Sequence, residues 1–480
     1  TGLNYDYADK YFLTASIRRD GSSRFLNNKW GTFGSVGLGW IVTKEDFMAN
    51  VGSLDFLKLK ASYGVIGDTG TALLNGFQVF NINQDPNGNI SYTISSEAAN
   101  PNLTWETSNV AQVGFESTWF DGRLGVDVDV YDRRTVDLIQ IANLAPSSGQ
   151  ETIRYNSGEL LNQGLEFNIN AKLIQKDNFR LSLNLNGETF KNEVTEMPTD
   201  PFTGEKAIFD DFNNIAEGVS QYDWYMREWA GVNPGNGEAL WYMYYVDEND
   251  NGVFDSGELS SFNGGSFEVD VDNDGVNDNA SGNLYEYQQL VPNANVRRTT
   301  TNSYADATQV FTGKSAIPDV RGGFRINAGF KNFDISAQFS YSFGGYTYDA
   351  GYAVLMDNNL IGADNFHTDI RQAWTTPGQV TDVPRTSANF GLDGNQNSFS
   401  SRFLTKADFF SLNNVNLNYR LSQSVVESMG LEGVSFTLSG DNLMFLSRRN
   451  GLNPSTAIGT TNSGIYMPLT TFSLGAKVQF

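Results

Sequence analysis

A two-residue alternation of apolar and polar side chains recurs along the whole chain, and it restricts the fold to one built from β-strands. The segment Leu165–Leu173 places leucine, phenylalanine, isoleucine and alanine at every second position, with Glu166, asparagines and a lysine between them. Successive strand side chains point to opposite faces, so such a segment has one apolar and one polar face. The final stretch, Met467–Phe480, repeats the pattern to the carboxyl terminus. A strand that is apolar on one whole face suits a barrel with lipid outside and water inside.

Fourteen segments carry this pattern and are predicted to be strands. The clearer ones are 11–18, 36–42, 57–65, 113–119, 124–130, 165–173, 179–186, 324–331, 333–343, 414–421 and the terminal strand, and the weaker ones are 222–231, 238–245 and 434–445.

The connections between these segments alternate in length. Short connections occur at positions such as Asp121-Gly122, Lys176-Asp177 and Lys331-Asn332, and each follows a long one. Short turns on one side and long loops on the other are typical of up-and-down outer-membrane barrels, with the turns in the periplasm. We therefore predict an all-β, transmembrane antiparallel β-barrel over residues 1–480, with a long extracellular loop insertion at 246–319.

Composition excludes several other classes. The hydrophobic fraction is 40% and apolar runs last only a few residues, so a transmembrane helix is not expected. The net charge of −23 argues against nucleic acid as a partner. Cysteine is absent and His367 is the single histidine, which excludes thiol chemistry and multi-histidine zinc sites. No paired carboxylates show spacing that indicates acid/base catalysis, so we do not expect an enzyme.

A soluble β-sandwich is the structural alternative, because its strands alternate in the same way. The long and short connections of a sandwich do not sort to opposite ends over so many strands, so the barrel is favoured.

Several blocks of the sequence resemble the SusC/RagA-like TonB-dependent outer-membrane transporters of Bacteroidota. The blocks are Asn4–Phe25, Asn100–Thr107, Tyr131–Thr135, Asn156–Glu166 and Ser439–Leu443, and they occur in the order found in that family.

This resemblance implies a barrel of about twenty-two strands filled by an amino-terminal plug. The chain is then the carboxyl-terminal part of the barrel, without the plug and the TonB-contacting segment, and its first and last strands need other polypeptide to cover them. The family's partners are a SusD-like surface lipoprotein, the TonB complex, the lipid bilayer and the barrel-assembly machinery, for which Phe480 is the expected signal. An insertion at Phe262–Ser315 departs from the family pattern.

The sharpest motif is a calcium-type loop at Asp247–Glu258. Oxygen-bearing side chains stand at its positions 1, 3, 5, 9 and 12, namely Asp247, Asn249, Asn251, Asp255 and Glu258, with Gly252 at the turn and the Val253 carbonyl at position 7. A solvated acidic turn is the plainer interpretation. The pattern predicts a calcium ion on the extracellular side, where millimolar concentrations suffice.

A second copy of the calcium motif follows it. Its candidate ligands are Asp270, Asp272, Asp274 and Asp278, and Ser281 replaces the glutamate of position 12. We expect it to bind calcium more weakly than the first loop.

Two aromatic clusters, one at 224–229 and one at 241–245, have two interpretations. They could be sugar-stacking platforms, but aromatic residues at strand ends more often form the girdle of a membrane barrel, and we favour the girdle.

The sequence thus predicts TonB-dependent import of oligosaccharides or peptides, with the substrate-binding residues unknown. Two alternatives remain: a structural docking platform within a larger outer-membrane complex, and a secreted calcium-binding glycan-recognition protein.

Overall fold

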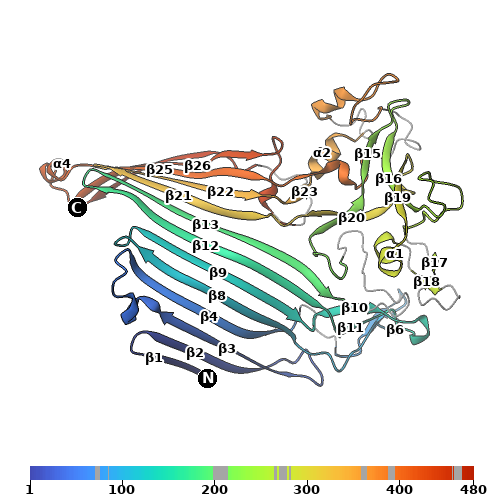
Figure 1. The fold of residues 1–480 in the computed structure, drawn as a ribbon, viewed down its shortest axis with the longest axis horizontal. Coiled ribbons are helices and arrows are strands. Elements are labelled where there is room, and N and C mark those ends of the chain that lie inside the picture. Colours follow the sequence, from blue (N-terminus) through green and yellow to red (C-terminus); the bar gives the residue numbers. More distant parts are fainter. Residues whose placement is uncertain are drawn as a thin grey trace.

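The computed structural model describes residues 1–70, 76–84, 86–197, 215–263, 267–269, 278–280, 283–357, 365–386, 395–456, 458 and 467–480. Its main feature is one antiparallel sheet of thirteen strands, which we call the wall (Figure 1). In spatial order the strands are β1 (Gly2–Tyr7), β2 (Tyr11–Gly21), β3 (Trp30–Ile41), β4 (Leu54–Asp68), β8 (Glu106–Trp119), β9 (Leu124–Val136), β12 (Glu159–Lys176), β13 (Phe179–Glu196), β21 (Val320–Phe330), β22 (Phe333–Phe343), β25 (Phe409–Arg420), β26 (Gly433–Ser447) and β27 (Thr471–Gln479).

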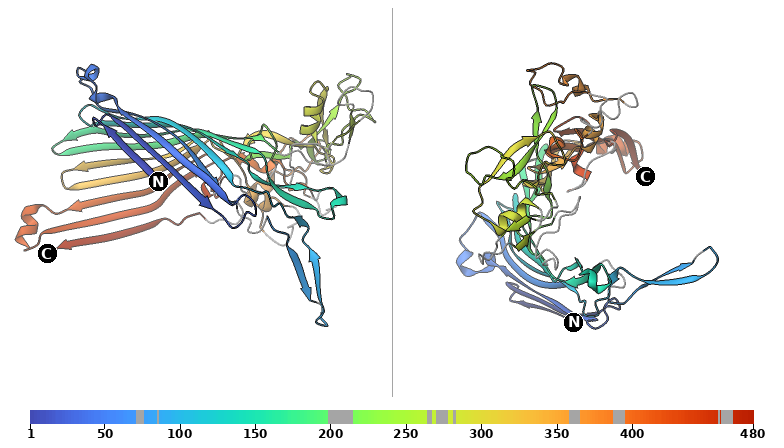
Figure 2. Two further views of the ribbon diagram at one scale, coloured as in Figure 1. Left: turned by 90° about the horizontal axis from the view of Figure 1, so that it is seen from below. Right: turned by 90° about the vertical axis from the view of Figure 1, so that its right-hand side faces the viewer.

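The wall is curved but not closed. Figure 2 shows it end-on as an arc, with the two termini at the ends of the arc. The strands are consecutive neighbours from β1 to β27, and within the described residues these two edge strands are not paired with each other. All six residues of β1 and all nine of β27 are exposed. Both edges therefore carry backbone groups without a neighbouring strand.

Connections sort by length between the two ends of the wall. Turns such as Asp121-Gly122 and Lys331-Asn332, together with the helix α4 (Gln423–Ser428) and the carboxyl terminus, lie at one end, and the long connections lie at the other (Figure 1). Phe120, Asp121 and Lys331 adopt positive φ, as tight turns require. Among the described residues no helix is long and apolar enough to cross a membrane.

Strand register confirms the two faces that the alternation predicts. At the short-turn end, one register row consists of aromatic residues on five adjacent strands, and all point to the outer face: Phe179, Phe330, Phe333, Tyr419 and Phe436. The rings of Phe333 and Tyr419 lie 4.5 Å apart. The apolar part of β13 begins at this row and runs from Phe179 to Thr189. Its length matches the roughly 9–11 residues of a membrane-spanning strand. We call the row the aromatic row.

Two segments that the sequence predicts as wall strands are not part of the wall. Residues 222–231 and 238–245 form β14 (Asp223–Arg227), β15 (Trp229–Val232) and β16 (Ala239–Val246), which belong to two small sheets beyond the long-loop end of the wall. Conversely, β1 is a wall strand that the pattern does not predict. The wall accordingly has thirteen strands rather than fourteen.

We call the described residues between β13 and β21 the surface module. It contains β14 to β16, β17 (Phe267–Val269), β18 (Asp278–Ala280), α1 (Leu284–Leu290), β19 (Val296–Thr301) and β20 (Gln309–Ser315). Phe262, Leu284 and Tyr287 form one of its cores, and Ala239, Trp241 and Ala307 form another.

The other long connections contain short elements of their own. They are β5 (Phe80–Gln84), β6 (Ile90–Ile94), β7 (Glu97–Ala98), β10 (Ile139–Asn143), β11 (Thr152–Asn156), β23 (Tyr346–Tyr348), α2 (Ala350–Leu355) and β24 (Leu404–Lys406). Tyr348, Ala353, Met356 and Phe403 from the β22–β25 connection pack with Trp224 and Met226 of β14, so this connection and the surface module share a hydrophobic core.

Candidate functional site: the inner face of the wall and its surface loops

The inner face of the wall is polar and carries several cavities, two of which span its middle strands. The larger, of about 840 Å³, lies toward the long-loop end and is lined by charged side chains from four strands: Asp127, Asp129, Glu166, Glu188 and Arg321. Tyr346 of β23 and Pro454 contribute from the loops. Arg321 pairs with Glu188, and Lys60 pairs with Asp129 at 2.8 Å. The face is therefore acidic, with some of its carboxylates neutralised within the wall.

Nearer the short-turn end, amide side chains dominate the inner face. A cavity of about 700 Å³ is lined there by Asn170, Asn184, Asn327, Asn416 and Asn418, among other polar residues. The Asn184 amide donates to Asn170 at 2.5 Å, and the Asn327 amide donates to Asn184 at 3.2 Å. Neutral amides both donate and accept, so this part of the face can hydrogen-bond to polar groups of either kind. The sequence predicts the polarity of these positions but no substrate-binding residue.

Residues from the family-like blocks gather at the long-loop rim. The Asn156 side chain accepts from the Thr104 amide at 2.8 Å and donates to the Thr104 carbonyl at 2.9 Å. The Trp105 ring lies 5.6 Å from that of Phe25, which is buried. These contacts join three long connections, so the blocks hold the rim together.

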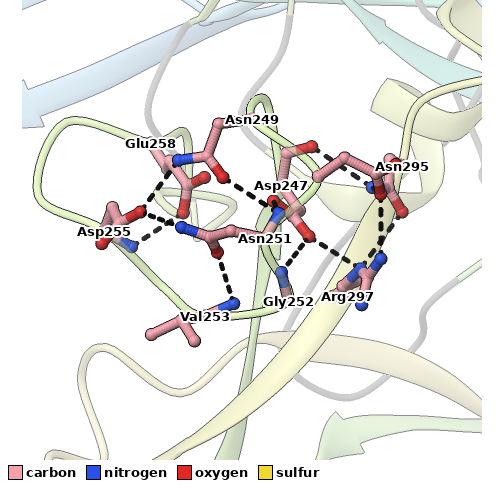
Figure 3. A network of polar contacts seen from close by, with 10 residues as sticks. Asp247, Asn249, Asn251, Gly252, Val253, Asp255, Glu258, Asn295 and Arg297 are labelled. Atoms are coloured by element: carbon pink, nitrogen blue, oxygen red, sulfur yellow. Dashed lines mark hydrogen bonds and ion pairs between the residues drawn. The ribbon is translucent and has the colours of Figure 1, made fainter.

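The first calcium-type loop follows β16 directly (Figure 3). The buried carboxylate of Asp247 accepts from the amides of Asn251 at 3.1 Å and Gly252 at 2.8 Å. Gly252 has φ +76°, which favours glycine at this sixth position. The side-chain Oδ1 of Asn251 accepts from the Val253 backbone amide at 2.7 Å. The motif therefore folds as a compact turn around its position 1 carboxylate.

The remaining predicted ligands lie on the other side of this turn. The Asp255 carboxylate accepts from the side chains of Asn249 at 2.9 Å and Asn251 at 2.6 Å, and these bonds lower the pKa of Asp255. Glu258 accepts from the Asp255 amide at 2.8 Å, while its Oε1 is buried and has no hydrogen-bond partner among the described residues. The structure thus brings all five predicted side-chain ligands into one loop.

Two observations weigh against a preformed metal site in this loop. Arg297 of β19 already pairs with Asp247 at 2.8 Å and with Asp250 at 3.0 Å. Within the described ranges, no three His, Cys, Asp or Glu side chains are gathered as a metal ion requires. Calcium binding at this loop stays a prediction.

The second calcium-type motif lies almost entirely outside the described residues. This applies to Asp270, Asp272 and Asp274, whereas Asp278 begins β18.

Four of the seven aromatic residues in the two clusters are core residues of the surface module, and Trp229, Tyr242 and Tyr244 are half-buried. Trp224, Tyr225, Trp241 and Tyr245 are at most 9% exposed. The girdle interpretation is therefore wrong for these residues, and their buried rings do not form an exposed sugar platform. The aromatic row of the wall stands at the position that a girdle occupies.

Phe480 follows β27 at the end of the chain and is 89% exposed. It lies at the short-turn end of the wall with α4 (Figure 1). Its role as an assembly signal stays a prediction.

The chain is similar to known proteins in family, sequence and structure. The family model described as "TonB dependent receptor-like, beta-barrel" matches residues 1–270. The TonB-dependent receptor P39 of Formosa agariphila is 29% identical over 471 residues, which cover 94% of this chain and 42% of that protein. The TonB-dependent receptor SusC of Bacteroides thetaiotaomicron is 27% identical over 489 residues, or 100% of this chain and 43% of SusC.

Among solved structures, the RagAB peptide transporter matches with a TM-score of 0.76 and 23% identity, covering 100% of this chain and 47% of the matched chain. At this identity the likeness establishes the fold. The chain spans less than half the length of these relatives.

Proposed function

Because the chain belongs to the TonB-dependent receptor-like β-barrel family, we propose that it forms the carboxyl-terminal part of the wall of an outer-membrane importer. The observation that carries the proposal is the two-faced sheet. Its outer face is an apolar belt bounded by the aromatic row, and its inner face is lined by charged and amide side chains. Such a wall separates lipid from a polar lumen.

The substrates we propose are oligosaccharides or peptides, taken up with energy delivered through the TonB complex. A polar lumen with hydrogen-bonding amides suits both classes of solute, and a relative of the same fold is a peptide transporter. A SusD-like surface lipoprotein is the expected partner at the long-loop end, and the barrel-assembly machinery is expected to recognise Phe480. Selection by loops and lumen requires no catalytic residues.

Uptake by cells tests this proposal. A strain lacking the gene is supplied with labelled oligosaccharide and peptide mixtures, and uptake is compared with that of the complemented strain and of a strain without TonB. We expect uptake of one class to require both the gene and TonB. Unchanged uptake of both classes, together with loss of an outer-membrane complex, would instead support the docking-platform alternative. Recovery of the protein from the medium would support the secreted one.

We also propose that the loop Asp247–Glu258 binds one calcium ion and stiffens the edge of the surface module. Three observations support calcium binding. The loop folds around Asp247, Gly252 has a positive φ, and Oε1 of Glu258 is buried without a hydrogen-bond partner among the described residues. Each of the amide and carboxylate oxygens that accepts one hydrogen bond here keeps a second lone pair for an ion.

Calorimetry on the full-length protein in detergent tests the calcium proposal. We expect a dissociation constant of about 10⁻⁴–10⁻³ M, as in extracellular calcium modules. Glu258→Gln removes the charge at position 12 and should weaken binding about tenfold or more, since each 1.4 kcal/mol is tenfold. Glu248→Gln removes a charge at position 2 of the loop, which supplies no ligand in the motif, and is the matched control. Equal affinity of the two variants would contradict the assignment.

A further inference from the structure

The larger inner cavity carries a row of three carboxylates on adjacent strands. Asp129 of β9, Glu166 of β12 and Glu188 of β13 stand directly opposite one another in the strand register, and all three line the cavity of about 840 Å³. Like charges directly opposite each other destabilise a sheet. The row therefore lowers the stability of the empty wall, and a ligand of opposite charge would offset this cost.

Two basic side chains neutralise only part of this charge. Lys60 of β4 lies 2.8 Å from Asp129 at one end of the row, and Arg321 of β21 pairs with the carboxylate at the other end. Between them, the Glu166 carboxylate is exposed and has no ion pair or hydrogen bond among the described residues. Asp127 lines the same cavity and forms no ion pair within that part of the chain. The cavity therefore keeps negative charge that favours a cationic occupant.

The geometry of the cavity favours an organic cation over a metal ion. Among the described residues, no three His, Cys, Asp or Glu side chains lie close enough together to hold a metal. The volume of the cavity falls in the range of roughly 300–1,000 Å³ that is typical of pockets for organic ligands. An ammonium or guanidinium group on a longer molecule fits both observations.

The side of the cavity toward the surface loops carries positive charge. Tyr346 of β23 lines the cavity at the long-loop end of the wall (Figure 1), and the ammonium groups of Lys314 and Lys406 lie 5.3 and 5.8 Å from the centre of its ring. Neither lysine forms an ion pair with a described residue. Carboxylates on the wall thus face a cavity that has ammonium groups on its loop side.

Two of the aromatic rings that line the cavity already have partners. The Tyr346 ring contacts two ammonium groups, and Phe409 stacks on Phe445 with their centres 5.4 Å apart. These rings are therefore poor platforms for sugar stacking, and an uncharged oligosaccharide leaves both charged sides of the cavity uncompensated. A peptide with a basic side chain and a free carboxyl terminus presents one charge to each side.

One buried hydroxyl gives independent support for a ligand in this cavity. Thr347 of β23 lines the cavity and is 4% exposed, and its Oγ1 has no hydrogen-bond partner among the described residues. A buried hydroxyl without a partner lowers the stability of the folded state. Peptide backbone, which carries a donor and an acceptor at each residue, can supply that partner.

We propose that this cavity binds peptides that carry a basic side chain and a free carboxyl terminus. The basic side chain contacts Glu166, and the terminal carboxylate lies toward Lys314 and Lys406. This inference rests on the proposed function, because it needs the inner face to line the path of an imported solute. It narrows the two proposed substrate classes to one kind of peptide.

Calorimetry on the full-length protein in detergent tests the proposal with defined probes. The first probe is an amino-terminally acetylated pentapeptide of four alanines with a central lysine, and the second has glutamine in place of the lysine. We expect the lysine peptide to bind about tenfold more tightly at low salt, as one charge-assisted hydrogen bond allows, and to lose this advantage as the ionic strength rises. An unbranched glucose pentasaccharide should bind more weakly than the lysine peptide.

Three variants assign the two charged sides of the cavity. Glu166→Gln should abolish the preference for lysine over glutamine. Lys314→Gln combined with Lys406→Gln should abolish the preference for a free carboxyl terminus over a terminal amide. Glu432→Gln changes an exposed glutamate beside α4 at the short-turn end, and as the matched control it should leave both preferences unchanged.

The possible results separate this inference from the proposed function. Equal affinity of the wild type for the two peptides, an unchanged preference in Glu166→Gln, or tighter binding of the pentasaccharide would overturn the peptide assignment. Loss of heat-modifiable mobility in Glu166→Gln would also overturn it, because the carboxylate would then stabilise the wall itself. Cellular uptake of the same probes, with and without TonB, is measured in parallel. TonB-dependent uptake of the pentasaccharide alone would refute this inference and leave the importer standing, whereas peptide binding without TonB-dependent uptake of any probe would support the cavity assignment and refute the proposed function.

Discussion

Leu183 and Asn184 are neighbours on β13 that face opposite sides of the wall. Leu183 stands in register with Ala171 and Ile326 on the outer face, and Asn184 bonds to Asn170 on the inner face. In the full-length protein we expect Leu183→Arg to cost about 2–4 kcal/mol, because it places a charge in the middle of the apolar belt. Asn184→Arg, in the polar lumen, should cost far less. Denaturant unfolding from lipid vesicles measures both, and equal losses would contradict the assignment of faces.

Three tyrosines of the surface loops couple the folding of this region to high pH. Burial, together with hydrogen bonds to Glu228 and Asp369, raises the pKa of Tyr244 and Tyr352 to about 12, and burial raises the pKa of Tyr348 to about 12. An unfolded tyrosine ionises near pH 10. The folded state therefore holds these protons more tightly than the unfolded state does. The resulting contribution to the free energy of unfolding is fully present below about pH 10 and is lost as the pH rises through about 12.

We expect the surface loops to unfold between these pH values while the wall stays folded. Tyrosinate absorbance reports the ionisation, and hydrogen exchange locates the unfolding. Simultaneous exchange of the wall strands with the surface module over this pH range would contradict the prediction.

At the scale of elements, one buried amide joins the wall to the surface module. Asn192 of β13 donates to Asn162 of β12 at 2.8 Å and accepts from the Ser220 hydroxyl at 3.0 Å and the Gln221 amide at 3.1 Å. Asn192→Ala leaves these buried groups without partners, which costs about 1–3 kcal/mol. We expect faster hydrogen exchange in β14, with little change in β12. Asn184→Ala is the control, because the Asn184 amide lies on the exposed inner face. Similar hydrogen exchange in the two variants would contradict the proposed link between the wall and the surface module through Asn192.

The alternation predicts most of the wall but does not tell which sheet a strand joins. Residues 238–245 alternate as well as β22 does, yet they pair with β19 inside the surface module. Alternation shows only that a strand has one apolar and one polar face. A strand in a surface loop with its own hydrophobic core alternates in the same way as a strand of a membrane barrel. β1 alternates too, with Leu3, Tyr5 and Tyr7 on one face and Asn4 and Asp6 on the other, but at six residues it is too short for the alternation to identify it as a strand.

The candidate sites differ in how far the sequence predicts them. The calcium-type loop is local, so its spacing predicts which side chains come together, and only the pairing of Asp247 with the distant Arg297 is missed. The two inner cavities each combine residues from four or more strands, and no short motif marks them. The signal that exists is the strand register, from which rows such as Asp129, Glu166 and Glu188 follow once the neighbours are known.

For the molecule as a whole, the shape of the wall and the coverage of its relatives point the same way. In the part of the chain that the structure describes, the sheet is an arc with two free edges, and the chain matches 42–47% of the relatives' length. An arc cannot keep lipid and water apart, and an uncovered strand edge in a bilayer leaves backbone groups without hydrogen bonds at a cost of several kcal/mol each. The proposed barrel therefore requires further polypeptide along β1 and β27.

This requirement predicts the behaviour of residues 1–480 expressed alone. We expect them to aggregate through the edges of β1 and β27, because exposed edges pair with other chains, and to show no heat-modifiable mobility in detergent. The full-length gene product should show it. The informative control is the Leu474→Pro variant of residues 1–480, with the substitution in the middle of β27. Proline removes a backbone hydrogen-bond donor from the strand, so it should reduce edge pairing without restoring a closed barrel. A stable, heat-modifiable, protease-resistant product from residues 1–480 alone would mean that the arc closes by itself into a smaller pore. That result would contradict the prediction that further wall strands are required.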